Sequence, residues 1–383
     1  MMAQFPERPK LRAYYHVVPL ADDRLLFQGG GNTVVLRGES VRDLLPLLLP
    51  LFDGTRTMPE IADALPDVAP EVVAGAIALF HEKQLLEDAA AIPPAVLAPY
   101  PDRLRPQAAF WLSLGDDRYA RQQRLATARV AILGIDAVGT ALAQSLAAAG
   151  VGNLLLVNTG AAAGRCAPRV DIDAGHDTGE DHGEALSSRL SALYGDVRCV
   201  AAASSATTPE EMTDLLDGCD MAVFCADAPA IAGIEALNEA CLHLHIPWTR
   251  GCLDHHRGVI GPTVIPRETA CFTCFTLRVR SNAAFVDDAI AFERHIRETG
   301  DGAAEPAFLA PLASMVAQHV ALETLKVLTG FAYPRTAGAL LALDALTGET
   351  TRHDVLKLPR CPTCGPLRDR PQMKIWDITT AAT

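Results

Sequence analysis

Lysine is scarce in this chain of 383 residues: 28 of its 33 basic residues are arginine and only five are lysine. No lysine lies between positions 84 and 325, which excludes any mechanism that needs a lysine in the middle of the chain. Positive charge is in deficit as well, because 46 acidic residues give a formal net charge of −13. A protein that acts on nucleic acid needs a basic face for the phosphates, so this composition argues against that function.

Long apolar runs are also missing. No stretch approaches the roughly 18 uninterrupted apolar residues of a membrane helix, and the densest run, residues 44–52, contains two prolines. The first residues are rich in proline and charge and lack the pattern of a signal peptide. With 49% hydrophobic and 21% charged residues, the composition is typical of packed globular proteins. We therefore expect a cytoplasmic chain without a membrane segment, built of two or three domains.

The N-terminal 88 residues predict a small separate domain. Residues 16–20, 24–28 and 33–38 have the composition of strands, and the turn residues 29–32 separate the second from the third. Three helical segments follow: one from the predicted N-cap Ser40 to Phe52, one that begins with a capping box at Thr57 and Glu60, and one over residues 71–86. Three strands followed by three helices predict a winged helix-turn-helix over residues 1–88. The next residues, 89–107, hold five prolines and predict an extended linker.

The charge of this domain indicates what it binds. Residues 1–88 contain eight basic and thirteen acidic side chains, so DNA is disfavoured as a ligand. A domain of this shape can instead capture a peptide, which adds as a strand to an exposed sheet edge beside a helix. Residues 33–37 are the candidate edge, and the helix over residues 71–86 is the candidate wall. The alternative is a structural prop between domains.

From residue 108 onward, strands alternate with helices. Buried-type strands over residues 128–135, 153–158 and 221–226, with helices over 137–149 and 229–244, predict an α/β fold with a parallel, Rossmann-like sheet. The turn after the first strand reads Gly134-Ile135-Asp136-Ala137-Val138-Gly139, with Asp136 where a nucleotide fingerprint has its middle glycine. The Asp136 carboxylate would repel phosphates. We expect this turn to preserve the fold without binding a nucleotide.

Two Cys-x-x-Cys pairs, Cys271 with Cys274 and Cys361 with Cys364, predict a structural zinc site of four thiolates. The alternatives are redox disulfides and unreactive core cysteines. The other six cysteines are single and are expected in the core. His255 and His256, near Asp254 and Cys252, could suggest a second metal site, but we favour a surface loop because adjacent histidines point apart.

The span 115–275 resembles the ThiF-like, ubiquitin-activating adenylyltransferase superfamily. The matching pieces are RYARQ (118–122), the run 128–134, AAAGVGNLLLV (147–157), FCADA (224–228), and IPWTRG before CFTC. The paired cysteines are similar to the family's structural zinc site. The resemblance implies a ThiF-type fold over residues 108–383, in a family whose active members form an acyl-adenylate on a peptide or protein C-terminus.

The chain departs from the active members of this superfamily at most nucleotide positions. Their Asp at the end of the second strand is Asn158, and their lysine is replaced by Glu180 or His182. Their Asp-Asn pair is Asp227 followed by alanine, and of the ATP-facing residues only Arg121 and Asp227 remain. ATP binding is therefore not expected, and we interpret the following residues as a vestigial nucleotide site: Gly134, Asp136, Gly139, Asn158, Arg121 and Asp227.

A silent ThiF-like domain behind an acidic winged helix resembles the leader-peptide-binding partners of YcaO-type cyclodehydratases, which take part in the biosynthesis of thiazole- and oxazole-modified ribosomal peptides. The resemblance implies that the winged helix binds the leader of a precursor peptide. It also implies that a separate YcaO enzyme uses ATP to form azolines in the core of that peptide. Superfamily members commonly pair, so a homodimer is expected. From position alone, the predicted peptide-binding residues are Thr33, Val34, Val35, Leu36, Val73, Ile77, Phe80 and Lys83.

Two other functions remain open. The chain could be an active ATP-dependent adenylyltransferase that activates a peptide or carrier-protein carboxylate, with Cys225 and Cys252 as the only obvious candidates for a central thiol. It could also be a ligand-sensing regulator that binds DNA, although the acidic N-terminal domain counts against this.

Overall fold

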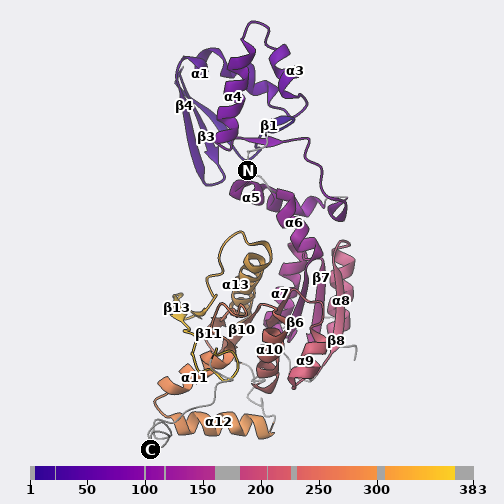
Figure 1. Cartoon of the computed structure of the whole chain (residues 1–383), viewed down its shortest axis with the longest axis vertical. Helices are drawn as coiled ribbons and strands as arrows, with labels where there is room; N and C mark the ends of the chain where they lie inside the picture. Colours follow the sequence, from indigo (N-terminus) through magenta and orange to yellow (C-terminus); the bar gives the residue numbers. More distant parts are fainter. Residues whose placement is uncertain are drawn as a thin grey trace, which may run out of the picture. The chain divides into compact units, whose positions relative to one another are not determined.

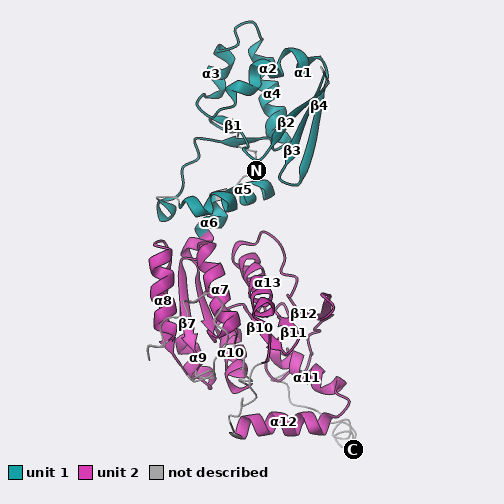
Figure 2. Cartoon of the chain, turned by 180° about the vertical axis from the view of Figure 1, so that it is seen from behind, with its two compact units in different colours: residues 1–123 teal, residues 124–383 magenta. Residues whose placement is uncertain are grey.

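The computed structural model describes residues 5–21, 23–98, 101–115, 118–159, 182–204, 206–225, 231–299 and 307–366. The chain divides into two compact units, residues 1–123 and residues 124–383 (Figure 2). No helix in the described ranges is both long enough and apolar enough to cross a lipid bilayer. The boundaries predicted from the sequence, at residues 88 and 107, remain predictions.

Unit 1 begins with strands (Figure 1). β2 (His16–Ala21), β3 (Arg24–Gly29) and β4 (Asn32–Arg37) form an antiparallel sheet in the order β2-β3-β4. The predicted turn between β3 and β4 is confirmed: it consists of Gly30 and Gly31, and both have positive φ, as a two-residue hairpin loop requires. A second antiparallel pair joins β1 (Pro9–Leu11) to β5 (Leu86–Asp88).

Helices follow the sheet in unit 1. The predicted helix from Ser40 to Phe52 is instead three short pieces, α1 (Glu39–Asp43), α2 (Leu45–Leu48) and the 3-10 helix η1 (Leu49–Leu51), because Pro46 and Pro50 interrupt the hydrogen-bond ladder. Gly38, not Ser40, is the N-cap residue of α1. α3 (Met58–Asp63) has the predicted capping box, and α4 (Pro70–Glu82) is the longest helix of the described part of unit 1. These elements have the predicted order, and their interpretation as a winged helix remains a prediction.

The proline-rich segment is not a fully extended spacer. It contains the 3-10 helices η2 (Ala95–Leu97) and η3 (Asp102–Leu104), and it leads into α5 (Arg105–Leu114) and α6 (Arg118–Thr127). Arg12, which is buried, donates from Nε to the carbonyl oxygen of Leu86 at 2.9 Å and from Nη1 to that of Leu112 at 3.0 Å. One guanidinium thus connects β5 to the C-terminal end of α5.

Unit 2 contains an eight-stranded sheet in the order β13-β12-β11-β10-β9-β6-β7-β8. Five strands are parallel, as predicted for a Rossmann-like sheet, and the remaining three extend it as antiparallel strands. The strands are β6 (Arg129–Leu133), β7 (Asn153–Asn158), β8 (Arg198–Ala203), β9 (Met221–Phe224), β10 (Trp248–Asp254), β11 (Arg257–Ile260), β12 (Ala339–Asp344) and β13 (Thr350–Asp354).

Helices cover both faces of this sheet (Figure 1). The helices are α7 (Ala137–Ala148), α8 (His182–Leu193), α9 (Pro209–Leu215), α10 (Ile231–Leu244), α11 (Phe272–Asn282), α12 (Val286–Thr299) and α13 (Ala310–Thr329). α13 packs along α7 and against β10 and β11. Its buried Glu323 accepts hydrogen bonds from the Thr336 backbone N and Oγ1, both at 2.7 Å, and pairs with Lys326 at 2.6 Å.

Candidate functional site

The glycine-rich turn lies at the point where the strand order of the sheet reverses. β6 pairs with β7 on one side and with β9 on the other, and ligands of α/β sheets bind at such a switch point. Gly134 has φ +87° and donates from its N–H to the carbonyl oxygen of Val157 at 3.0 Å. A Cβ on Gly139 would lie 1.9 Å from the Gly134 oxygen, so the first turn of α7 packs directly on the loop. Both glycines therefore have structural roles that do not depend on a nucleotide.

Asp136 and Asn158 lie at the same edge of the sheet as these glycines. Asp136 is the N-cap residue of α7, and its side chain makes no capping hydrogen bond. The N-terminus of a helix attracts negative charge, and nucleotide-binding folds place a phosphate there. A carboxylate at this position brings its own negative charge to the place that a phosphate would need. Asn158 is the last residue of β7, as predicted.

The other residues predicted around the nucleotide site are His182, Arg121, Asp227 and Glu180. His182, at the start of α8, lies with Nε2 3.2 Å from Thr140 Oγ1 of α7, so it is near the glycine turn. Arg121 belongs to unit 1, where its Nη1 donates to the Trp111 carbonyl oxygen at 3.2 Å. Asp227 and Glu180 lie outside the described residues. Of the six residues predicted as a vestigial site, the structure describes all but Asp227, and it brings Gly134, Asp136, Gly139 and Asn158 to one edge of the sheet in unit 2.

The four predicted metal ligands come together in unit 2. The Sγ atoms of Cys271, Cys274, Cys361 and Cys364 all lie within 4.8 Å of one another. Neighbouring sulfurs are 3.5 to 3.9 Å apart, which matches the roughly 3.8 Å edge of a tetrahedron with zinc–sulfur bonds of about 2.3 Å. These separations are far longer than a disulfide bond. The cluster can therefore hold a zinc ion.

The surroundings of the cluster favour thiolate ligands. Cys271 is the N-cap residue of α11 and Cys274 lies in its first turn, where the helix dipole stabilises negative charge. Hydrogen bonding from Cys271 and Cys364 holds the pKa of Cys274 well below its ordinary value, and the same contact with Cys274 raises the pKa of Cys271. The backbone N–H of Leu358 also donates to Cys274 Sγ, at 3.4 Å. The start of α11 and the Leu358 N–H thus favour a thiolate at Cys274.

A buried asparagine positions the first cysteine pair, and sequence reasoning missed it. Asn238 of α10 accepts a hydrogen bond from the Phe272 backbone N at 2.9 Å, which satisfies one free N–H at the start of α11. The two cysteine pairs are also linked by Thr273 and Thr363, whose hydroxyl oxygens are 2.9 Å apart. Asn238 precedes the motif by more than thirty residues and lies in an ordinary helix, so no spacing signal pointed to it.

The remaining sequence predictions about cysteine and histidine concern residues outside this cluster. Cys219, Cys225 and Cys241 are buried as predicted, Cys199 and Cys252 are only partly buried, and Cys166 lies outside the described residues. His255 and His256 form the exposed turn between β10 and β11, which confirms the surface loop. Within the described ranges, the four-cysteine cluster is the one group of three or more side chains that could hold a metal ion.

The two edges of the three-stranded sheet in unit 1 differ in chemistry. β2 carries Pro19 and an irregular register between Pro19 and Ala21, features that block further strand pairing. β4 has neither a proline nor a bulge, and within the described residues it pairs only with β3. The predicted edge residues, Thr33 to Leu36, therefore lie on an open strand.

The predicted wall on α4 needs a correction. Val73, Ile77 and Phe80 are at most 1% exposed and belong to the core of unit 1, so they do not line an open groove. The neighbouring stripe of the same helix is the accessible one: Val72 is 50% exposed and Leu79 is 40% exposed, and Lys83 continues it. The Lys83 ammonium pairs with Glu82 at 3.0 Å on the surface.

The chain belongs to the ThiF family, whose model matches residues 105–364. It is 23% identical over 244 residues to the molybdopterin-synthase adenylyltransferase of Escherichia coli, a match that covers 64% of this chain and 90% of that protein. It is 28% identical over 270 residues to the sulfur carrier protein adenylyltransferase of Thermus thermophilus, covering 67% of this chain and 93% of that protein.

Two solved structures are similar over most of the chain. E. coli MccB, crystallised with succinimide, has a TM-score of 0.68 and 17% sequence identity, covering 93% of this chain and 99% of MccB. PaaA has a TM-score of 0.68 and 19% identity, covering 90% of this chain and 99% of PaaA. MccB, described as a microcin C7 biosynthetic enzyme, has also been crystallised with ATP and with N-formylated MccA. At these identities the likeness establishes the fold.

Proposed function

We propose that this protein is a non-catalytic subunit that binds the leader of a ribosomal precursor peptide. It would present the core of that peptide to a separate, ATP-dependent YcaO cyclodehydratase that forms azolines. Holding the peptide by its leader keeps the core near the partner enzyme at an effective concentration in the millimolar range. The proposal includes pairing with a second copy, as in other superfamily members, which sedimentation of the purified protein would test.

The observation that carries this proposal is the difference between the edges of the sheet in unit 1. Natural sheets protect their edges, and β2 is protected by Pro19 and its bulge. Among the described residues, no strand covers the outer edge of β4 (Asn32–Arg37). An open edge of this length supplies N–H and C=O groups in the spacing that an added peptide strand needs.

Backbone geometry indicates which groups of β4 would pair with the peptide. The two-residue loop makes Gly29 and Asn32 a hydrogen-bonded pair, and in an antiparallel ladder such pairs alternate with non-hydrogen-bonded ones. Thr33, Val35 and Arg37 therefore direct their N–H and C=O groups away from β3. These three residues would hold the peptide backbone.

Replacement of Val35 tests this directly. Val35→Pro removes an N–H that β3 does not use, and Val35→Thr is the matched control because it keeps the N–H and the branched side chain. The probes are labelled synthetic peptides that span the short open reading frames encoded beside the gene. We expect one of them to bind the intact protein and the Val35→Thr variant, and to lose at least tenfold in affinity for Val35→Pro. Equal binding to both variants would refute strand addition at β4.

A second function, ATP-dependent adenylation, is favoured by family membership and by the names of the relatives. The retained glycines of the turn, Gly134 and Gly139, are compatible with it. Asp136 at the N-terminus of α7 counts against it. Calorimetric titration of the zinc-loaded protein with Mg·ATP decides between them: no heat at millimolar nucleotide supports the binding subunit, and micromolar affinity would replace it with an adenylyltransferase.

A further inference from the structure

The outer face of the three-stranded sheet in unit 1, the face turned away from the helices, has an ordered pattern. The strand register places Val18, Leu26 and Val35 side by side across the sheet. Val18 and Val35 are exposed, which makes this row an apolar surface. In the next row on the same face, Arg24 lies directly opposite Arg37. The face is therefore apolar in its centre and basic at the end where β4 stops.

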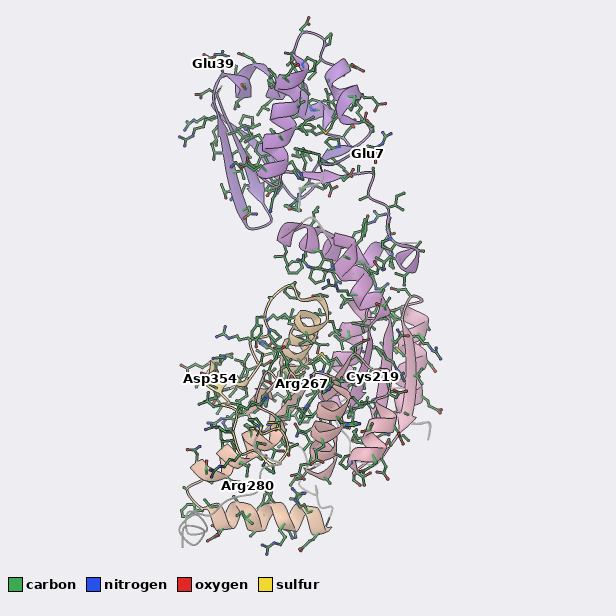
Figure 3. The ribbon with its side chains drawn as sticks, in the orientation of Figure 1. Glu7, Glu39, Cys219, Arg267, Arg280 and Asp354 are labelled. Carbon is green, nitrogen blue, oxygen red and sulfur yellow. The ribbon has the colours of Figure 1, made fainter. Side chains whose placement is uncertain are left out.

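The two arginines repel each other in the free protein. Arg24 and Arg37 form a non-hydrogen-bonded pair, in which the Cα atoms of facing residues are only about 4.5 Å apart. Like charges in this position destabilise a sheet. The nearest acidic residues in the described sequence are Asp23, which precedes Arg24, and Glu39, which follows Arg37 by two positions. Glu39 is the first residue of α1 and is labelled in Figure 3. Within the described part of the chain, neither acidic residue forms an ion pair with either arginine. A carboxylate from a ligand would relieve this repulsion.

We propose that the peptide held by β4 carries an acidic residue opposite Arg37, followed along the strand by three apolar residues and then a polar one. This inference rests on the proposed strand addition and specifies its substrate class. An added strand continues the rows of the sheet, so its side chains face those of Arg37, Leu36, Val35, Val34 and Thr33 in turn. Antiparallel addition places the acidic residue first in the motif, and parallel addition places it last.

The charge of the whole domain would predict the opposite preference. Residues 1–88 carry thirteen acidic and eight basic side chains, so their summed field attracts a basic peptide. At physiological salt, however, charges more than about 8 Å apart are largely screened. The Arg24–Arg37 pair acts at contact distance, so it decides the preference at this one position of the bound strand.

The test uses labelled peptides containing Asp-Leu-Val-Leu-Ser between Gly-Ser flanks, the same peptide with lysine for aspartate, and the reversed order of each. Fluorescence anisotropy with the intact protein measures affinity. We expect one direction of the aspartate peptide to bind about two- to fivefold more tightly than its lysine counterpart, the range for surface ion pairs. Arg37→Glu should invert this preference. Arg56→Glu changes the net charge equally at an exposed position paired with Asp53 and should leave it unchanged.

The outcomes distinguish the two proposals, strand addition at β4 and an acidic residue opposite Arg37 in the bound peptide. If the aspartate and lysine peptides bind equally and Val35→Pro blocks both, strand addition stands and the acidic motif is wrong. If none of the motif peptides binds, the motif is also wrong. Strand addition itself fails if a peptide encoded beside the gene binds Val35→Pro and Val35→Thr alike. Inversion of the preference by Arg37→Glu alone supports both ideas.

Discussion

Gly139 should tolerate no side chain, although it lies inside a helix where alanine is normally preferred. A Cβ there would lie 1.9 Å from the Gly134 carbonyl oxygen, and an ordinary carbon–oxygen contact is about 3.3 Å, so α7 and the turn must separate by about 1.4 Å. Overpacking of this kind costs up to about 3 kcal/mol, and the helix propensity of alanine returns about 1 kcal/mol. We expect Gly139→Ala to lose about 2 kcal/mol of unfolding free energy, which for a unit of this size lowers Tm by about 4–8 °C.

The matched control is Gly75→Ala. Gly75 is also inside a helix, α4, but a Cβ there would meet nothing within 4 Å. This variant should gain about 0.5–1 kcal/mol from reduced backbone freedom. Scanning calorimetry of both variants gives the comparison. A Gly139→Ala variant as stable as the wild type would refute the packing argument, because the glycine would then be available for a ligand.

Three further predictions concern the cysteine cluster, a helix cap and the buried carboxylate. Cys364→Ser should lose bound zinc, measured by atomic emission, and should melt like the chelator-treated wild type; retention of a full zinc ion would refute the four-thiolate site. Thr57→Ala should cost about 1 kcal/mol in urea unfolding at pH 7. Hydrogen bonds from the Thr57 backbone and side chain lower the pKa of Glu60, so this contribution is present above the ordinary glutamate pKa and is lost as pH falls. The difference in unfolding free energy between the wild type and Thr57→Ala should therefore shrink near pH 3. A difference that stays constant with pH would contradict the capping box. Glu323→Ala breaks a buried pair with Lys326 and should cost about 3 kcal/mol by the same assay; an unchanged midpoint would show that the pair contributes nothing.

The parts of the fold that the sequence predicted well have strong local signals. β6, α7 and β7 follow from a dense apolar strand, a glycine turn and a second apolar strand. The cysteine cluster follows from ligand spacing within each pair. In contrast, β13 is exposed along its whole length, so it has no hydrophobic pattern that could reveal it. The short pieces α1 and α2 were predicted as one helix because prolines near a helix start are ambiguous from sequence.

The candidate peptide site shows a different limit of sequence reasoning. On α4, the stripe of Val73, Ile77 and Phe80 and the stripe of Val72 and Leu79 are both apolar. Either could face the core, and only packing against β3, where Phe27 contacts Phe80, decides between them. The edge strand could be predicted because its residues are consecutive in the sequence and follow a clear turn signal. The Arg24–Arg37 pair depends on strand register, which the sequence does not determine without the hairpin geometry.

The hydrogen bond from Arg12 to the Leu112 carbonyl oxygen of α5 determines how long a fragment of the N-terminal unit must be. A fragment that ends at residue 88 or 107 keeps the Arg12 guanidinium but removes the Leu112 carbonyl oxygen that accepts its hydrogen bond. A buried charge that loses an acceptor costs folding free energy, so such a fragment is expected to be less stable than the same residues in the full chain. A fragment meant to fold as this unit therefore needs the residues up to the end of α5, so that Arg12 keeps both of its carbonyl acceptors.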